Sequence, residues 1–416
     1  MKEEGYLMHS IISVKEQCTG CGNCQLICNH KAVELKEDKY GFIRASINHE
    51  KCADCGVCLQ VCPVVKPKYK ANIISMMARS SDKSRKESAS GGVFAGIALQ
   101  MLQKKDMHVC GAAFYDGEIK HILLNSSNDL HKIQGSKYVQ SNMNDVNERI
   151  YSILKNGGSV LFGGTPCQCE AVDKFLNFKR CSTDNLYLVD LICHGVPPFA
   201  FLKKELQGYS NINNIEDINF RWKKSLHKGK SSYALRIKHV SHNIFYKSSK
   251  ELVVKIDRSP YYCAFMQGRI LRDSCYECKF SKLSRVGDIT IGDCGINDKY
   301  NFYPGESVST ILINSEKGKV LFDKYIKMFE VKSMDINDEI AVNPQLVRPF
   351  QKSDDWQQAR EDFINDKMTL KELRQKYATP YKFTSHIRMI LQKILPNNVF
   401  NVVDKIGRRW RQLWRM

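Results

Sequence analysis

Eight of the seventeen cysteines in this 416-residue chain form two runs, at residues 18–28 and 52–62, each with the spacing C-x2-C-x2-C-x3-C. Three thiolates at this spacing lie on one tight loop around a cubane cluster, and the fourth cysteine of each run ligates the other cluster. The sequence therefore predicts two 4Fe–4S clusters. One set of ligands is Cys18, Cys21, Cys24 and Cys62, and the other is Cys28, Cys52, Cys55 and Cys58.

Zinc and disulfides are weaker explanations of these two runs. Zinc ribbons use paired C-x-x-C motifs rather than runs of four cysteines. Disulfides need an oxidising compartment, but the first residues, MKEEGYLMHSIISVKEQ, are acidic and lack the apolar segment of a secretory signal. No apolar stretch reaches the roughly 18 residues of a transmembrane helix. We therefore expect a cytoplasmic protein with metal-bound thiolates. Asn29 replaces the proline that usually follows the fourth cysteine, and Pro63 keeps it in the second run.

Four further cysteines could form a site of their own. Cys167 and Cys193 each follow a short apolar run that predicts a buried strand, at 159–162 and 186–192. Side chains at such strand ends meet at one edge of a sheet, where sites tend to form. Cys275 and Cys278 add one C-x-x-C pair. By spacing alone, the four thiols suit a third cluster, a zinc ion or plain buried cysteines.

The elements that must position these cysteines are a mixture of helices and strands. Helical patterns cover 91–107, 145–155, 199–206 and 317–329. Further strand patterns cover 109–114, 288–292, 308–313 and much of 215–256. Residues 66–90 are interpreted as a linker followed by a polar loop. Since strands and helices do not alternate regularly, we predict an α+β (mixed α/β) fold, with a small ferredoxin-like two-cluster domain before a larger domain.

Five strings along the chain resemble the coenzyme F420 hydrogenase/dehydrogenase beta-subunit family. They are SASGGVF (88–94), QGSKYVQS (134–141), GGTPCQ (163–168), LICHGVP (191–197) and SCYECKFSKLSRVGDITIGD (274–293). They keep the family's order over roughly residues 72–350, and the fused double ferredoxin resembles the longer, dehydrogenase-type members. The family usually continues with aromatic residues after the last Gly-Asp. This chain has Cys294 and Gly295 there, which leaves the substrate open.

The resemblance implies a third 4Fe–4S cluster beside an FAD. Its ligands would be Cys167, Cys193, Cys275 and Cys278. The flavin would lie near two groups of residues, Ser90, Gly91 and Gly92, and Ser136, Lys137 and Tyr138. Free backbone N–H groups before a helix could hold a phosphate, although the glycines also suit a simple helix-entry turn. Lys137 could pair with the pyrophosphate or the flavin ring, or could be an ordinary surface lysine.

His194 follows one of these proposed ligands and is the one candidate catalytic residue. It could donate to the cluster environment or relay a proton, and a buried hydrogen-bonded histidine is the alternative. No G-x-G-x-x-G follows a strand, so a Rossmann nucleotide site is not supported.

These motifs divide the chain into four regions. Residues 1–66 form the double 4Fe–4S ferredoxin domain, and 72–155 and 156–350 form the N- and C-terminal parts of the beta-subunit-like domain. Residues 381–416 form a basic tail with eight Lys or Arg and one Asp. Its apolar residues recur at helical spacing, which suits peripheral contact with the inner, anionic face of a membrane or docking on a protein. Nucleic acid is a weaker interpretation, because no aromatic platform accompanies the charge.

The expected function is that of an iron–sulfur flavoprotein oxidoreductase. FAD would exchange two electrons with reduced coenzyme F420 or an organic substrate, and the clusters would pass single electrons to ferredoxin or another redox protein. The formal net charge of +19 favours acidic partners. Two alternatives are a non-catalytic electron-transfer subunit of a membrane-associated complex and a ferredoxin-dependent reductase in surface-polysaccharide synthesis.

Overall fold

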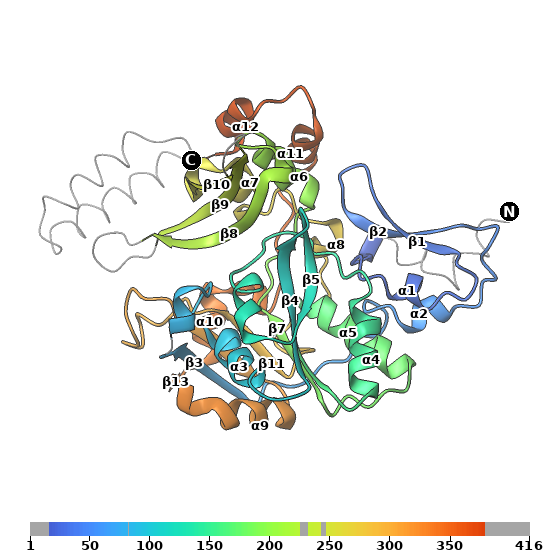
Figure 1. The fold of residues 1–416 in the computed structure, drawn as a ribbon, viewed down its shortest axis with the longest axis vertical. Helices are drawn as coiled ribbons and strands as arrows, with labels where there is room; N and C mark the ends of the chain where they lie inside the picture. The colour runs from blue at the N-terminus through green and yellow to red at the C-terminus, as the bar shows by residue number, and fades with distance from the viewer. Residues whose placement is uncertain (1–15, 82, 225–231, 243–246, 379–416) are drawn as a thin grey trace, which may run out of the picture.

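The computed structural model describes residues 16–81, 83–224, 232–242 and 247–378 (Figure 1). The predicted basic tail, 381–416, lies outside the described residues. Within the described part of the chain, no helix is long and apolar enough to cross a membrane.

An eight-stranded mixed sheet forms the centre of the molecule, with the strand order β13-β3-β12-β11-β7-β6-β4-β5. Four neighbouring strands run parallel: β4 (Met107–Tyr115), β6 (Ser159–Gly164), β7 (Leu186–Leu191) and β11 (Ile289–Asp293). The flanking strands are antiparallel to their neighbours: β5 (Glu118–Leu124), β12 (Ser309–Ile313), β3 (Ile74–Ser80) and β13 (Phe329–Ser333). The predicted mixed α/β fold is confirmed.

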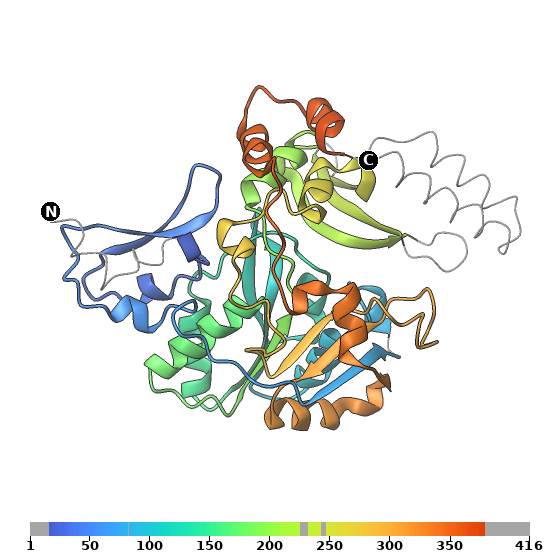
Figure 2. The same cartoon turned by 180° about the vertical axis from the view of Figure 1, so that it is seen from behind.

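Helices cover both faces of this sheet (Figures 1 and 2). On one face, α3 (Val93–Met101) and α9 (Glu316–Tyr325) pack over inward side chains such as Leu161. On the other, α4 (Val146–Lys155) and α5 (Pro166–Phe178) pack over the alternate side chains, such as Phe162. Strands buried on both faces have continuous apolar sequences. That is why β6 and β7 could be predicted from the sequence.

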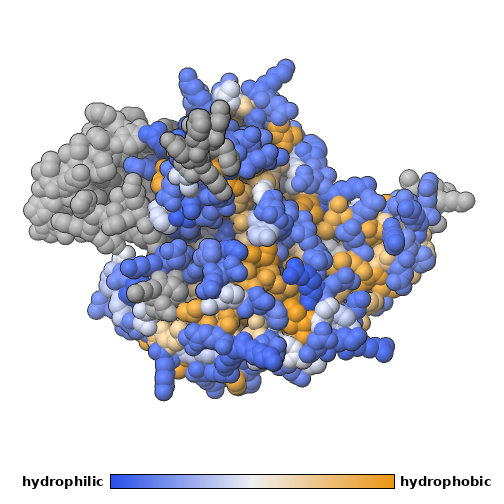
Figure 3. Space-filling view, viewed as in Figure 1, coloured by the Kyte–Doolittle hydropathy of each residue, from blue (hydrophilic) through white to orange (hydrophobic). Residues whose placement is uncertain are grey.

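An upper lobe is inserted between β7 and β11 (Figure 1). Its antiparallel sheet consists of β8 (Ile215–Lys224), β9 (Ser232–His242) and β10 (Lys247–Lys255). Around it pack α6 (Phe199–Gln207), α7 (Pro260–Met266), α11 (Trp356–Ile364) and α12 (Leu370–Tyr377). Apolar residues gather on the visible face between this lobe and the central sheet, and extend toward the N-terminal module (Figure 3).

The N-terminal module is small and held together by short elements. A hairpin of β1 (Val33–Glu37) and β2 (Ile43–Ile47) packs with α1 (Asn23–Leu26) and α2 (Val57–Gln60). Both helices begin after a glycine with positive φ, 82° at Gly22 and 70° at Gly56. Glycine reaches this left-handed conformation without steric cost, so each cysteine run can turn tightly into its helix.

Buried polar contacts fix this module to the large domain. The Asn23 side chain, 0% exposed, donates to the Ala171 carbonyl at 2.8 Å and accepts from Asn147 Nδ2 at 2.5 Å. Gln140 forms hydrogen bonds with both the N–H and the carbonyl of Ile43, at 3.0 and 3.1 Å. Because these groups are desolvated, separating the two parts would leave polar atoms unsatisfied. The module is therefore packed in place rather than tethered.

Two element predictions were wrong. Residues 66–90 were interpreted as linker and loop, but Ile74–Ser80 form β3 inside the sheet. Arg79 interrupts the apolar pattern of this segment. In the structure it is buried by stacking on the Tyr303 ring at 3.6 Å and by pairing with Glu306 at 3.0 Å. The helix expected over 317–329 ends earlier, because Phe329 starts β13 and pairs with β3.

Replacing Asn147 tests the packed interface. Asn147→Ala leaves the buried Asn23 Oδ1 without its donor, so we expect the free energy of unfolding to fall by about 1–3 kcal/mol. Anaerobic urea denaturation measures this change. Asn156→Ala, at the exposed end of the same helix, should have little effect. Equal midpoints for both variants would contradict a packed interface.

Candidate metal centres

The two cysteine runs meet around one cavity in the N-terminal module, which we call the N-terminal cavity. Cys18, Cys21, Cys24 and Cys62 all line it, together with Thr19 and Leu35. Three of these cysteines come from the first run and one from the second, which is the grouping that the sequence predicts. Backbone N–H groups point at sulfur, as from Ala45 to Cys18 Sγ at 3.5 Å. Such hydrogen bonds are typical of cluster environments.

The other four cysteines of the runs, which we call the Cys28 group, lie toward the outside of the module. Cys28 and Cys58 pack beside Cys24, and the Ala32 N–H donates to Cys28 Sγ at 3.3 Å. Cys52 is half-buried and Cys55 is exposed. This group is therefore the more accessible of the two to a protein partner.

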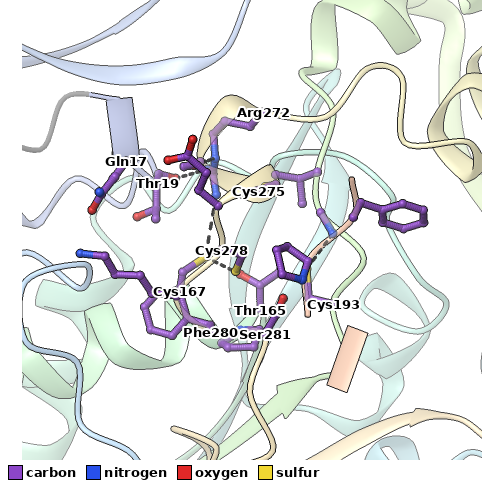
Figure 4. A pocket seen from close by; sticks show the side chains of 18 of the residues that line it. Gln17, Thr19, Thr165, Cys167, Cys193, Arg272, Cys275, Cys278, Phe280 and Ser281 are labelled. Atoms are coloured by element: carbon purple, nitrogen blue, oxygen red, sulfur yellow. Dashed lines mark hydrogen bonds between the residues drawn. The ribbon is translucent and has the colours of Figure 1, made fainter. Parts of the chain in front are cut away.

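Four cysteines from three separate segments line another cavity, between the central sheet and the N-terminal module (Figure 4). We name it the third cavity, after the third cluster that the family resemblance implies. Cys167 lies in the first turn of α5, and Cys193 follows β7. Cys275 belongs to α8 (Asp273–Tyr276), and Cys278 follows this helix. The cavity encloses about 600 Å³ of space free of atoms, part of it open to solvent. The structure thus brings together the four cysteines that the sequence singled out.

Strand order explains why Cys167 and Cys193 meet. β6 and β7 are parallel neighbours, so their carboxyl ends lie at one edge of the sheet. Thr165 and Gln168 form a capping box that starts α5 directly after β6, with Pro166 in its first turn. Thr165 Oγ1 lies 3.1 Å from Cys167 Sγ.

A glycine and a buried ion pair position the remaining ligand candidates. Gly195 has φ of 98°, and a Cβ there would lie 3.2 Å from that of Cys275. Its N–H donates to Cys193 Sγ at 3.4 Å. Arg285 and Asp190, 3.1 Å apart and almost fully buried, join the loop after Cys278 to β7. Arg285 also donates to the carbonyls of this loop and of β7. Sequence reasoning missed this arginine, because nothing in its local pattern marks it as buried.

The cavities are poor places for free thiolates. Burial raises the pKa of the Cys193 thiol well above its usual range and that of Cys278 to about 11. In the N-terminal cavity, burial raises the pKa of Cys21 to about 12 and that of Cys62 to about 11. Thiols of this kind stay protonated at neutral pH unless a cationic centre binds the thiolate. All seventeen cysteines are free of disulfides.

The two cavities adjoin, because Thr19 lines both of them. Arg272 lines the third cavity and is 4% exposed. Burial alone lowers the pKa of this guanidinium, but thiolates at Cys275, Cys167 and Cys18 would raise the pKa overall. No group of three or more His, Cys, Asp or Glu side chains in the described residues is arranged to hold a single metal ion. The cysteines instead surround cavities.

The first predicted flavin segment is tightly packed. Ser90 Oγ donates to the Val308 carbonyl at 2.8 Å, and the Gly91 N–H donates to Ser309 Oγ at 3.0 Å. A Cβ on Gly91 would lie 2.5 Å from the Ala78 carbonyl oxygen, so only glycine fits. Gly92, with φ of 83°, precedes α3. The Gly91 N–H thus already has a partner, in contrast to the free donor that the sequence suggested.

The second predicted flavin segment lies beside the first. Gln134 Nε2 donates to Ser88 Oγ at 3.2 Å and so joins the two loops. Lys137 Nζ donates to the Gln134 carbonyl at 2.8 Å, and burial lowers its pKa to about 8. Tyr138 stacks on Phe265 with ring centroids 4.8 Å apart. Ser136, which precedes Lys137, is half-buried.

Arg221 of β8 is a further residue that the sequence did not reveal. Its guanidinium pairs with Asp293 at the end of β11 and donates to the Tyr138 hydroxyl at 3.1 Å. It thereby joins the upper lobe to the central sheet beside the second flavin segment. Asp288, the other aspartate of the same motif, is structural. It accepts from Lys70 Nζ, the Leu188 N–H and Ser315 Oγ.

His194 lines the third cavity, and its Nε2 lies 3.2 Å from Asn343 Oδ1. Burial lowers the pKa of its imidazole. A proton-relay role for this residue stays a prediction.

A ferredoxin-like module with paired cysteine runs, packed against a mixed α/β domain, defines an iron–sulfur electron-transfer protein. Residues 17–65 match the family described as 4Fe-4S dicluster domain. Residues 157–339 match the family described as the C terminus of the coenzyme F420 hydrogenase/dehydrogenase beta subunit. The chain therefore combines a 4Fe–4S dicluster domain with a later domain that matches the C terminus of this beta subunit.

Two relatives agree with this assignment. One, a subunit of the F(420)H(2) dehydrogenase of Methanosarcina mazei, is 23% identical over 321 residues, which are 74% of this chain and 81% of that protein. The other, the ferredoxin-like protein in the nif region of Sinorhizobium fredii, is 41% identical over 59 residues, 13% of this chain and 84% of that protein. Among solved structures, a chain of the F420-reducing [NiFe] hydrogenase complex from Methanosarcina barkeri aligns with a TM-score of 0.44 and 17% identity, covering 67% of this chain and 90% of that one.

The grouping of cysteines across the two runs can be tested with single substitutions. Cys62→Ala should alter the same cluster EPR signal as Cys21→Ala, and Cys28→Ala the same signal as Cys52→Ala, because each fourth cysteine ligates the other run's cluster. Anaerobic EPR of the reduced variants makes the comparison. If Cys62→Ala instead matches Cys52→Ala, each run holds its own cluster and the crossed assignment is wrong.

Proposed function

We propose that the protein is a flavin-dependent iron–sulfur oxidoreductase. A two-electron substrate would react at FAD, and a third 4Fe–4S cluster held by Cys167, Cys193, Cys275 and Cys278 would connect the flavin to the ferredoxin module. The observation that carries the proposal is the third cavity, where four free cysteines from distant parts of the chain converge beside the N-terminal cavity.

The residues of the third cavity fit a cluster. Four sulfur donors form a complete ligand set for a 4Fe–4S centre. The Gly195 N–H and the Arg272 guanidinium supply hydrogen bonds to sulfur, at 3.4 Å to Cys193 and 3.9 Å to Cys167. Such donors stabilise an anionic cluster and set its potential. Iron analysis separates this site from a four-thiolate zinc site.

The loops around Lys137 fit an anionic cofactor. In the described part of the chain, no carboxylate forms a salt bridge with Lys137, although the charge of Asp217 raises its pKa, and carbonyls of its own loop hold the ammonium group. A partly desolvated cation without a paired carboxylate favours a phosphate or an anionic ring. Ser90, Gly92, Ser136 and Tyr138 would form the rest of this site. FAD would supply the conversion between two-electron and one-electron chemistry.

The cavities are arranged as a route for single electrons. The third cavity adjoins the N-terminal cavity through Thr19. The Cys28 group lies beyond the N-terminal cavity, beside Cys24. Cys55 in this last group is exposed, which suits exchange with ferredoxin or another redox protein. The packed interface keeps these spacings constant during turnover.

Reduced coenzyme F420 is the proposed two-electron substrate, since the Methanosarcina mazei relative is named for its dehydrogenation. A net charge of +19 suits a phosphorylated, acidic cofactor. Because that relative is named as one subunit of an enzyme, the second candidate is an electron-transfer subunit of a larger complex, without turnover of its own.

Iron and flavin content test the proposal. Anaerobically purified protein should contain about twelve iron atoms, four for each of three clusters, and one FAD that bleaches with reduced coenzyme F420. Cys278→Ala should lose about four iron atoms. Cys263→Ala, a buried cysteine of α7 outside the cavities, is the matched control. Eight iron atoms and no flavin would contradict the proposal, because only the two clusters of the ferredoxin module would then be present.

The pH dependence of flavin affinity tests Lys137. Its pKa of about 8 means that the ammonium loses its proton as pH rises through this value. FAD affinity of deflavinated protein should therefore weaken between pH 7 and 9. Lys137→Gln should bind FAD more weakly at pH 7 and show a flat profile. The same decline in this variant would exclude Lys137 as the titrating group.

A further inference from the structure

Arg272 lines the third cavity and contacts Thr19, a residue that also lines the N-terminal cavity. It precedes α8, and its backbone N–H donates to the Val196 carbonyl at 3.0 Å. Arg272 is 4% exposed, and each nitrogen of its guanidinium contacts a different partner. Nη2 lies 3.9 Å from Cys167 Sγ, Nη1 donates to the Thr19 carbonyl, and Nε donates to Ser274 Oγ at 2.8 Å (Figure 4). One guanidinium thus contacts a sulfur of the third cavity and the backbone of Thr19, which lines both cavities.

No carboxylate in the described residues forms a salt bridge with Arg272. The adjacent Asp273 is engaged elsewhere, by Arg44 at 2.7 Å and Arg360 at 2.8 Å. A buried cation without an anion is costly, so such a group is expected beside a negative charge. The thiols that would become cluster thiolates are the groups placed to supply it.

Ser274 makes a short bonded connection between the cavities. Its Oγ donates to the Cys18 carbonyl at 3.3 Å, and its own peptide bond leads to Cys275. One residue and one hydrogen bond therefore separate a ligand candidate of the third cavity from one of the N-terminal cavity. Thr19, the acceptor of Arg272, is the next residue along the same backbone.

We propose that Arg272 and Ser274 are positioning residues for electron transfer between these two clusters, an inference that rests on the proposed function. The guanidinium charge would stabilise the reduced state of the clusters on both sides and raise their potentials. Ser274 supplies the hydrogen-bonded path. One electron would pass between the third cluster and the cluster of Cys18, with no bond made or broken.

Potentials measured on the full-length protein test the charge. In Arg272→Gln, EPR-monitored titration should shift two clusters to more negative potential and leave the Cys28 cluster unchanged, which provides an internal control. Arg269→Gln, in the same segment but paired with Asp355, should shift none. No shift, or an equal shift of all three clusters, would overturn the proposal.

Two further variants separate charge from path. Ser274→Ala should keep the potentials but slow reduction of the ferredoxin clusters several-fold in freeze-quench EPR; a wild-type rate would refute the path.

Arg272→Lys carries a point charge that cannot reach both Cys167 and Thr19. One of the two potentials should fall, and this variant decides the question if Arg272→Gln does not retain iron. Both potentials unchanged would overturn the role of the charge.

Iron content distinguishes the two levels of failure. A wild-type protein with only eight iron atoms lacks the third cluster, which defeats the proposed function itself. Twelve iron atoms with unshifted potentials in Arg272→Gln would defeat this inference alone.

Discussion

The contact between helix α5 and the N-terminal module sets the distance between the cysteine groups. The start of α5 holds Cys167, because the capping box turns the chain directly out of β6. Further along the same helix, the Ala171 carbonyl accepts from Asn23, Glu170 accepts from the Lys68 N–H, and Lys174 donates to the Val65 carbonyl. One rigid helix therefore carries a ligand candidate at its end and the ferredoxin module on its side.

This arrangement suits one-electron transfer, which needs short and constant distances rather than moving parts. A tethered module would sample many positions, whereas buried side chains such as Asn23 and Asn147 lose hydrogen bonds if the interface opens. Burial also raises the pKa of the Cys21, Cys62, Cys193 and Cys278 thiols, which stay protonated when no metal is bound. The same desolvation that makes thiolates unfavourable makes a bound, positively charged iron core favourable.

Motif residues divide into those that face a cavity and those that hold the fold. In the string that contains Cys275 and Cys278, both cysteines line the third cavity, while Arg285 and Asp288 stabilise the loop and the central sheet. Asp293 in the same string pairs with Arg221 from the upper lobe. This one string therefore contains residues that could bind a cluster and residues that only stabilise the fold.

The sequence by itself determined the two cysteine runs, the apolar strands that became β6 and β7, and the four further cysteines, because spacing and continuous burial are local signals. Tertiary structure decided what lies between the cavities. Arg272, Arg285 and Arg221 look like ordinary surface arginines in sequence, and each is buried by partners distant along the chain. β3 was missed for the same reason, since Arg79 is buried by Tyr303 and Glu306, which are distant along the chain. A charge can be buried only where the fold supplies its partners, and a local sequence pattern does not contain that information.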